Sequence, residues 1–300
     1  MIIDRQLLLV AAVFLFAAFV VELIAYRYLK RSGYGAAEAM ASLFLGLAHT
    51  ITGFVEAGII IAVSYFFWDY RLADVPKDAW WGWLALFLGF ELAYYWWHRA
   101  AHAVRWLWAS HAVHHSPERL NILATARVVV SDLLSARWLF MLPLVFIGFE
   151  PGAVFIVVGL SHIYQIWIHT ELIPKLGPLE YILDTPSNHR VHHAINAEYI
   201  NHNYGSTLIV FDRIFGTYVE ERSDVPCRYG LLGETKPNNP VWVVLHEWIA
   251  MARYVQRSAS FREALGYVFG RPGWNPAWLP EHSDNVSSRN VSENTKDTIH

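Results

Sequence analysis

Long apolar runs separate the polar parts of this chain, and they dictate its architecture. Residues 7–25 contain one charged side chain, Glu22, and residues 43–68 and 80–97 form two further apolar runs. Each run is long enough to cross a hydrocarbon core about 30 Å thick as a helix. Trp and Tyr side chains gather at both ends of residues 80–97, as is typical where a span meets the membrane interfaces. The sequence therefore predicts membrane-spanning helices before residue 98.

Two more apolar runs follow, at residues 128–149 and 152–168, and the Glu150-Pro151-Gly152 turn separates them. Asp132 and Arg137 interrupt the first run, so we expect either two further spans or a re-entrant hairpin. Apolar residues make up 55% of the chain and charged residues 16%, against about 25% charged in a soluble domain. The predicted fold is all-α: a polytopic membrane protein with four to five transmembrane or re-entrant helices and a cytosolic helical cap.

Basic residues indicate the orientation of these helices. Arg27, Lys30 and Arg31 follow the first run, and four arginines lie between residues 98 and 127. Basic loops favour the cytoplasmic side, so we expect Met1 outside and the polar segments after residue 97 inside. The net charge of -3 gives no electrostatic reason to expect a nucleic-acid partner.

Eight of the fifteen histidines stand in three short boxes. Residues three and four apart share one face of a helix, so each box directs two or three imidazoles toward one point. The boxes are His98 and His102; His111, His114 and His115; and His189, His192 and His193. Pro117 follows the second box, and Pro186 precedes the third at a position that suits a helix start.

This spacing predicts a metal centre. A single histidine is more often an ordinary core or surface residue, but three boxes of clustered imidazoles would lose hydration and, if charged, repel one another. Metal binding removes both problems because ligating histidines are neutral. Imidazole suits Zn, Cu, Fe and Ni. Eight or nine nitrogens are too many for one ion, and they fit two six-coordinate irons better than two tetrahedral zincs.

Other histidines receive separate predictions. His169, at the end of the last apolar run, is expected to be a ninth ligand. His162 is expected to serve a pocket or helix packing, and His202 either binds metal or, as we prefer, supports a ligand. His49 and Glu56 share a helix face, which predicts a polar pair that joins helices. No His-Glu-x-x-His motif and no phosphate-binding glycine loop occur in the chain.

The sequence around the boxes resembles the fatty acid hydroxylase superfamily, also called the sterol desaturase family, and is most similar to its alkylglycerol monooxygenase branch. The resemblance covers roughly residues 80–230. It rests on Tyr95 to His102, Trp108 to Ser116, Asn121 with Thr125-Ala126, Tyr164 to Glu171, Leu176 to Glu180, Thr185 to His193, Asn203 to Gly205 and Phe211 to Thr217.

The resemblance implies a di-iron centre on the cytosolic face, with O2 as co-substrate and a membrane lipid as substrate. It implies hydroxylation of a lipid C–H bond, as in alkylglycerol ether cleavage or sterol or fatty acyl hydroxylation, or alternatively desaturation. Electrons are expected from a separate donor, either tetrahydrobiopterin or a cytochrome b5 or ferredoxin-type partner. The nine implied metal ligands are His98, His102, His111, His114, His115, His169, His189, His192 and His193.

Supporting residues and domain limits complete the predictions. Glu171, Glu180 and Asp184 are candidates to orient imidazoles, as second-layer carboxylates do. Further pocket candidates are Asn121, His162, His202 and Trp167. Residues 1–79 are expected to form N-terminal transmembrane helices, residues 80–280 the catalytic domain with an amphipathic helix over 239–270, and residues 281–300 a disordered tail. Rival functions are a non-oxidative metal-binding membrane protein, either a transporter or a di-zinc hydrolase.

Overall fold

The computed structural model describes residues 5–29, 33–233 and 235–276, and the predicted tail lies outside them. Every regular element in these residues is helical, apart from one isolated antiparallel bridge between Leu183 and Leu208. The prediction of an all-α fold is thereby confirmed. The elements are α1 (Arg5–Tyr28), α2 (Ala36–Trp68), α3 (Trp80–Ala103), α4 (Arg105–His115), η1 (Ile122–Ala126), α5 (Asp132–Ser135), α6 (Arg137–Ile147), α7 (Pro151–Ile168), η2 (Gly177–Tyr181), α8 (Pro186–His193), α9 (Val210–Phe215), α10 (Pro240–Arg257) and α11 (Phe261–Phe269).

Two helices among the described residues, α2 and α7, are long and apolar enough to cross a membrane. In α2 only 6% of the most apolar window is buried inside the fold, and Leu47, Ile51 and Phe54 are more than half exposed. Such a large apolar surface is uncommon on a soluble protein. A membrane environment for these helices is consistent with their composition, whereas the number of spans and a cytosolic cap stay predictions.

Residues 128–149 do not form one helix. Ala136 adopts a left-handed backbone (φ 54°) and separates the single turn α5 from α6. With 11 residues, α6 is about 16 Å long, which is about half of a hydrocarbon core. Helix α6 alone is thus too short for a full span, and the choice between two further spans and a re-entrant hairpin stays a prediction. Helix α6 then turns at Gly148 into α7.

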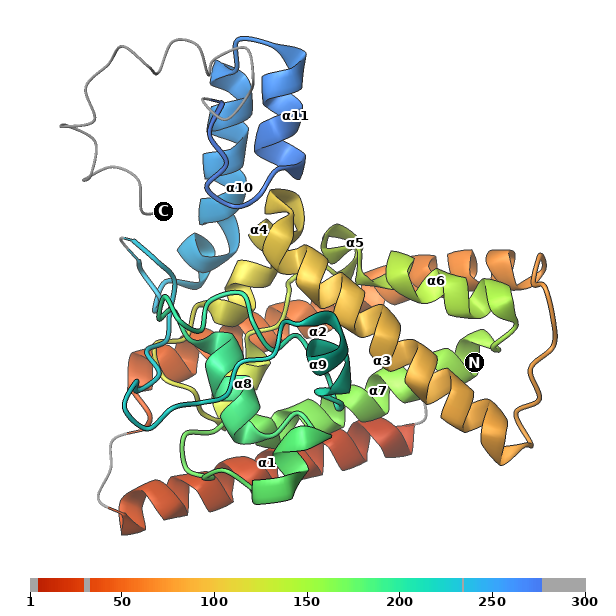
Figure 1. The fold of residues 1–300 in the computed structure, drawn as a ribbon, viewed down its shortest axis with the longest axis horizontal. Coiled ribbons are helices and arrows are strands. Elements are labelled where there is room, and N and C mark those ends of the chain that lie inside the picture. The colour runs from red at the N-terminus through yellow and green to blue at the C-terminus, as the bar shows by residue number, and fades with distance from the viewer. Residues whose placement is uncertain (1–4, 30–32, 234, 277–300) are drawn as a thin grey trace.

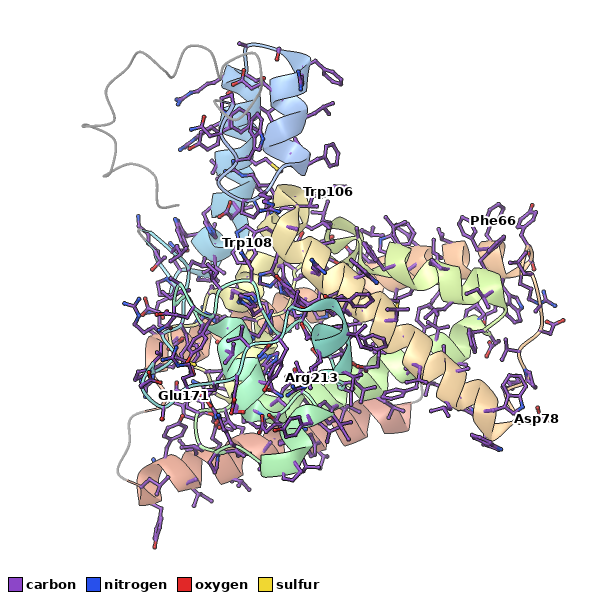
Figure 2. The ribbon with its side chains drawn as sticks, viewed as in Figure 1. Phe66, Asp78, Trp106, Trp108, Glu171 and Arg213 are labelled. Atoms are coloured by element: carbon purple, nitrogen blue, oxygen red, sulfur yellow. The ribbon has the colours of Figure 1, made fainter. Side chains whose placement is uncertain are left out.

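The helices α3, α6 and α7 enclose the main apolar core. Phe90 of α3 packs with Met141 and Leu144 of α6 and with Val154 of α7, and all are buried. The loop between α2 and α3 crosses the far end of this bundle, where the Leu72 and Val75 amides donate to backbone carbonyls of the α6–α7 turn. Phe66 and Asp78 mark this end in Figure 2, opposite Glu171.

The predicted helix over 239–270 is two helices. Ser258 ends α10, and Ser260 begins α11 by accepting a hydrogen bond from the Glu263 amide at 3.1 Å. The extended backbone at these serines breaks the helical pattern that the apolar spacing suggested. The two helices form a hairpin that packs on α4 and projects from the rest of the molecule (Figure 1). Helix α10 therefore lies against α4, which carries the second histidine box.

The N-terminal helices are joined to the later ones by buried polar contacts. His49 of α2 hydrogen-bonds the Val129 carbonyl at 2.7 Å. The Glu56 carboxylate accepts from the Ser131 hydroxyl at 2.6 Å and the Asp132 amide at 2.7 Å. These contacts agree with the interpretation of His49 and Glu56 as a helix-joining pair. The boundary at residue 79 stays a prediction.

Arg127 is fully buried and connects three segments. Its guanidinium donates to Ser42 of α2, to Ser116 after α4 and to the Pro237 carbonyl before α10, each at 2.9 Å. Replacing it leaves three acceptors without a donor, a change that costs several kcal/mol in buried ion-pair networks.

We expect Arg127→Ala to lower the free energy of unfolding by about 3–5 kcal/mol. Thermal unfolding in detergent measures the effect. The exposed Arg253→Ala is the control and is expected to change stability by less than about 0.5 kcal/mol. Equal midpoints for the two variants would contradict the role assigned to Arg127.

Candidate metal centre

Three helices and one helix end present the histidines. His98 and His102 lie in the last turns of α3, and the extended backbone of Val104 lets α4 fold back against α3. Helix α4 carries the second box. Helix α8 carries the third and begins with Thr185 as N-cap and Pro186 in its first turn. His169 terminates α7.

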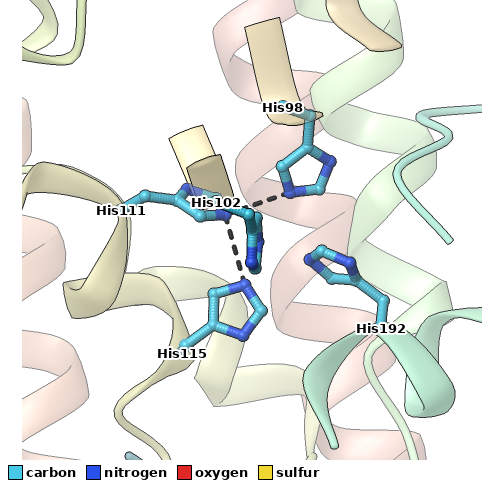
Figure 3. A group of neighbouring side chains, drawn as sticks. All are labelled: His98, His102, His111, His115 and His192. Atoms are coloured by element: carbon cyan, nitrogen blue, oxygen red, sulfur yellow. Dashed lines mark hydrogen bonds between the residues drawn. The ribbon is translucent and has the colours of Figure 1, made fainter. Parts of the chain in front are cut away.

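The nine histidines form two groups whose ligand nitrogens lie within 4.8 Å of one another in each group. A metal–imidazole bond of about 2.1 Å separates two ligands of one ion by up to about 4.2 Å, so both groups are close to the size that a metal requires. Figure 3 shows the first group. It contains His98, His102, His111, His115 and His192, and the second contains His114, His169, His189 and His193.

The helical spacing of the boxes explains the division. On α4, His111 and His115 point to the first group while His114 points to the second. On α8, His192 belongs to the first group, whereas His189 and His193 belong to the second. Each helix therefore contributes to both groups, so that the groups must lie side by side.

Ring contacts between the groups support this proximity. The His115 and His193 rings stack with centroids 4.4 Å apart, and the His189 and His192 rings stack with centroids 5.4 Å apart. Two ions bound in these groups would be neighbours. The arrangement fits a dinuclear centre better than two remote sites.

The Nε2 atoms of the imidazoles converge on one another. Nε2 of His111 lies 3.0 Å from that of His98 and 3.2 Å from that of His115. In the second group, Nε2 of His169 lies 3.3 Å from that of His114 and 3.0 Å from that of His189. These contacts place ring nitrogens against ring nitrogens rather than against ordinary acceptors.

The Nδ1 atoms of five rings face acceptors on the outer side. His98 hydrogen-bonds the Tyr204 carbonyl at 2.9 Å. The other four pairs are His114 with the Arg127 carbonyl, His169 with the Gln165 carbonyl, His189 with the Asp184 carboxylate and His192 with the His202 carbonyl, at 2.7–3.2 Å. An acceptor at Nδ1 fixes the proton there and leaves Nε2 as a lone pair.

The tautomer with its proton on Nδ1 shows whether the site suits a metal. In the His169–His114 and His169–His189 pairs both Nδ1 atoms are committed to acceptors, so two Nε2 lone pairs face each other. A cation between them turns this repulsion into attraction. Nε2 of His102 and of His192 is also buried without a hydrogen-bond partner among the described residues, and unsatisfied buried nitrogens are costly. The residues fit bound metal ions.

Burial keeps the imidazoles neutral. Desolvation, reinforced by neighbouring rings for most of them, lowers the pKa of all nine below the ordinary value of about 6.5. It lowers the pKa of His114 to about 4 and that of His169 to about 3. Neutral imidazole is the form that binds a metal, so the ligand groups need no deprotonation at neutral pH.

Of the three carboxylates predicted to orient imidazoles, the structure places Asp184 against a box histidine. Asp184 Oδ2 lies 3.1 Å from His189 Nδ1, and both residues are buried. Glu180 instead accepts from the Thr185 and Ser187 hydroxyls at 2.6 Å and holds the start of α8. Glu171 instead accepts from the Leu120 amide at 3.0 Å and lies 3.5 Å from the Arg119 guanidinium, so its role in orienting an imidazole stays a prediction.

The other pocket candidates lie around the centre without joining either group. Asn121 caps η1 through the Ala124 amide and donates to the Gly33 carbonyl at 2.8 Å. Trp167 packs edge-on against Tyr164 with centroids 5.6 Å apart. His202 contributes its carbonyl, rather than its ring, to the centre.

His162 contacts Arg137 at 2.6 Å on the bundle side. It is not part of either histidine group, which agrees with the expectation of helix packing.

Sequence reasoning missed two supporting residues. Tyr204 supplies the carbonyl behind His98, and its ring lies beside His102 at a centroid distance of 5.3 Å. The buried Asp212 fixes that backbone by accepting from the Tyr204 amide and the Thr217 hydroxyl, each at 2.7 Å. A carbonyl acceptor leaves no signal in a side-chain pattern, although Asp212 stands in a segment that carried the family resemblance.

Residues 83–217 match the family model described as Fatty acid hydroxylase, and this range contains all nine clustered histidines. These residues form a fatty acid hydroxylase domain. The chain is 37% identical over 283 residues to alkylglycerol monooxygenase of Xenopus tropicalis. The aligned part covers 92% of this chain and 62% of that protein. The resemblance seen in the sequence is thereby confirmed.

Two other relatives are also similar in sequence to this chain. The human alkylglycerol monooxygenase is 37% identical over 241 residues, or 80% of this chain and 53% of that protein. Ornithine lipid hydroxylase OlsE of Rhizobium tropici is 36% identical over 129 residues, or 43% of this chain and 39% of that protein. The chain spans about three-fifths or less of the length of these relatives. No solved structure matches it.

The contact of Asp184 with His189 predicts a specific loss. Removing a carboxylate that orients a ligating histidine typically lowers metal affinity by about 10- to 100-fold. We expect Asp184→Asn to lose metal from the second group in this range, measured as metal retained against a chelator. The control is Asp224→Asn, which alters an exposed carboxylate paired with Arg222. Retention of both metals by Asp184→Asn at wild-type affinity would refute the assignment.

Neighbouring histidines of α8 are expected to differ. His192→Ala leaves four nitrogens in its group, whereas His189→Ala leaves three and also removes the partner of Asp184. We therefore expect His189→Ala to lower the metal content of the purified protein further than His192→Ala does. His246→Ala, whose ring stacks on Trp242, serves as a control with full metal content. The reverse order of the two α8 variants would show that the grouping is incorrect.

Proposed function

We propose that this chain is an integral-membrane, non-haem di-iron monooxygenase that hydroxylates a C–H bond of a lipid. The observation that carries the proposal is the pair of adjoining groups of neutral imidazoles, eight of the nine buried, within a fatty acid hydroxylase domain. All nine clustered histidines are proposed as ligands, five on one ion and four on the other. A lipid-directed reaction is supported by relatives named as alkylglycerol monooxygenase and as ornithine lipid hydroxylase.

Iron ions bound there would supply the reductive activation of dioxygen. The chain's own residues hold and shield them. Backbone carbonyls behind His98, His114, His169 and His192 fix the ring orientations. Burial of the ligands excludes bulk water, and a dry site protects a reactive centre from side reactions.

Aromatic residues form the wall between the first histidine group and the bundle. The Trp97 ring stacks on His98 with centroids 5.7 Å apart, and the Tyr94 ring meets His98 edge-on at 5.3 Å. Both belong to α3, which packs against α6 and α7. We propose that the lipid's apolar chain runs along this wall. The wall connects the metal ligands with α7, one of the two helices apolar enough to cross a membrane.

Desaturation on the same centre is the alternative within this chemistry. A transporter is a weaker candidate, since the five Nδ1 contacts hold these ligands in fixed orientations and a transported ion must leave its site. A di-zinc hydrolase would not need nine imidazoles. The alkylglycerol branch suggests cleavage of an alkyl ether after hydroxylation, with sterol and fatty acyl hydroxylation as further options. For the electrons we propose an external reductant, either tetrahydrobiopterin or a cytochrome b5 or ferredoxin-type partner.

The proposed orientation places the histidine boxes at the cytoplasmic face. Arg27 and the partly exposed Arg99 and Arg119 support it. Arg105 and Arg127 are buried and serve the interior of the fold, so their charges carry less of this argument than the sequence suggested.

The test combines metal content with oxygen uptake. In protein purified anaerobically from iron-supplemented cells, we expect about two irons per chain and O2 consumption that requires both a reductant and an added lipid. Lipid extracts analysed by mass spectrometry should then contain a hydroxylated or ether-cleaved product. Two zincs without oxygen consumption, in protein shown to retain its metal throughout purification, would refute the proposal. An unsaturated product would favour the desaturase alternative.

A further inference from the structure

A second polar cluster lies on the bundle, outside the histidine groups. Arg137, the first residue of α6, donates to Asp132 Oδ1 of α5 at 2.8 Å and contacts His162 Nε2 of α7 at 2.6 Å. Asp132 and His162 thus flank one guanidinium. None of these three side chains belongs to either histidine group.

The surroundings of this cluster make its polarity costly. His162 is exposed although it lies in α7, one of the two helices apolar enough to cross a membrane. The exposed side chains of Leu134, Leu139 and Leu160 belong to the same three helical segments. Ionisable residues in membrane segments usually face the bundle interior and mark functional positions. The exposed edge of His162 that does not face Arg137 can therefore meet a polar group from outside the fold.

The cluster adjoins the metal centre through one ring. The guanidinium carbon of Arg137 lies 5.7 Å from the centroid of the Trp97 ring. The same ring stacks on His98 and meets His111 edge-on at 5.6 Å. The Trp97 indole donates to the Ser135 carbonyl at 3.0 Å, which ties the ring to the break between α5 and α6. A molecule held at the cluster is therefore separated from the ligands of the first group by a single tryptophan.

The position along the helix also suits a lipid. His162 precedes His169 by seven residues, a rise of about 10 Å. A lipid whose head is held beside His162 would have its first chain atoms beside the Trp97 wall. Its tail would remain in the apolar environment of α6 and α7.

The available hydrogen-bonding atoms define the head group. Because Arg137 donates to His162 Nε2, the proton of the neutral ring stands on Nδ1 and points to a ligand as a donor. Asp132 Oδ2 has no hydrogen-bond partner among the described residues and offers an acceptor. A hydroxyl group satisfies both, since it donates and accepts, whereas a phosphate oxygen only accepts and an ammonium group only donates.

Charge gives the same answer. Arg137 contributes one positive charge, and Asp132 and the adjoining Glu56 contribute two negative charges. The net negative balance disfavours an anionic head. An ammonium head would meet the Arg137 guanidinium, which contacts both Asp132 and His162, and it could not accept from the His162 N–H.

We propose that Asp132 and His162, positioned by Arg137 at the break between α5 and α6, bind the uncharged, hydroxyl-bearing head group of the lipid substrate. The inference rests on the proposed function, because it assumes that the substrate reaches the histidine groups from the membrane.

Binding is measured with the metal-loaded full chain in nanodiscs and without reductant, so that no turnover is required. The probe is 1-O-hexadecylglycerol, with hexadecyl phosphate and hexadecylamine as charged analogues and hexadecane as the chain without a head. We expect the glycerol ether to bind tightest. Asp132→Asn and His162→Gln are each expected to weaken its binding about 5- to 10-fold, as the loss of one hydrogen bond does, with hexadecane unaffected.

The matched controls are Asp224→Asn and His246→Gln, which should bind like the wild type. His162→Gln changes an exposed side chain, so it keeps the test valid if Asp132→Asn lowers the thermal midpoint. Unchanged glycerol-ether binding in both variants, an equal loss for hexadecane, or tighter binding of the phosphate or the amine would each overturn the proposal. Lipid-dependent O2 uptake with unchanged binding would reject this site alone. Selective binding without any O2 uptake would reject the proposed function and leave the site intact.

Discussion

Neutral imidazoles face one another through their unprotonated nitrogens, and the rest of the structure depends on resolving that repulsion. Acceptors behind His114, His169 and His189 commit each Nδ1 proton outward and leave the Nε2 lone pairs 3.0–3.3 Å apart. Burial lowers the pKa of these rings, which disfavours extra protons between them at neutral pH. Bound cations satisfy this geometry, and the fold around it fits the role of a scaffold for metal ions.

Much of the scaffold consists of backbone, not side chains. The carbonyls of Tyr204, Arg127, Gln165 and His202 hold four of the rings. Buried side chains hold these backbone segments in turn, as Asp212 does for Tyr204. Changes at such positions are expected to disturb the metal centre without touching a ligand, because a ring that rotates loses its alignment with the metal.

On the membrane side of the molecule, apolar and polar residues also have separate roles. The apolar exterior of α2 and α7 suits lipid, while the break at Ala136 keeps α6 short and brings polar groups to its first residue. Trp97 stands between that polar group and the first set of imidazoles. The proposed reaction needs such a contact between the two regions, because the lipid must reach the buried histidine groups while its chain stays in the bilayer.

Local sequence determined the helical class, the positions of the boxes and the sharing of faces within each box, because helical periodicity acts over three or four residues. It also indicated His169 and a pair at His49 and Glu56. Tertiary structure alone decided that α4 and α8 each serve two groups and that Asp184 rather than Glu171 meets an imidazole. Those outcomes depend on how distant segments pack, and the spacing of residues along one segment carries no information about its partner.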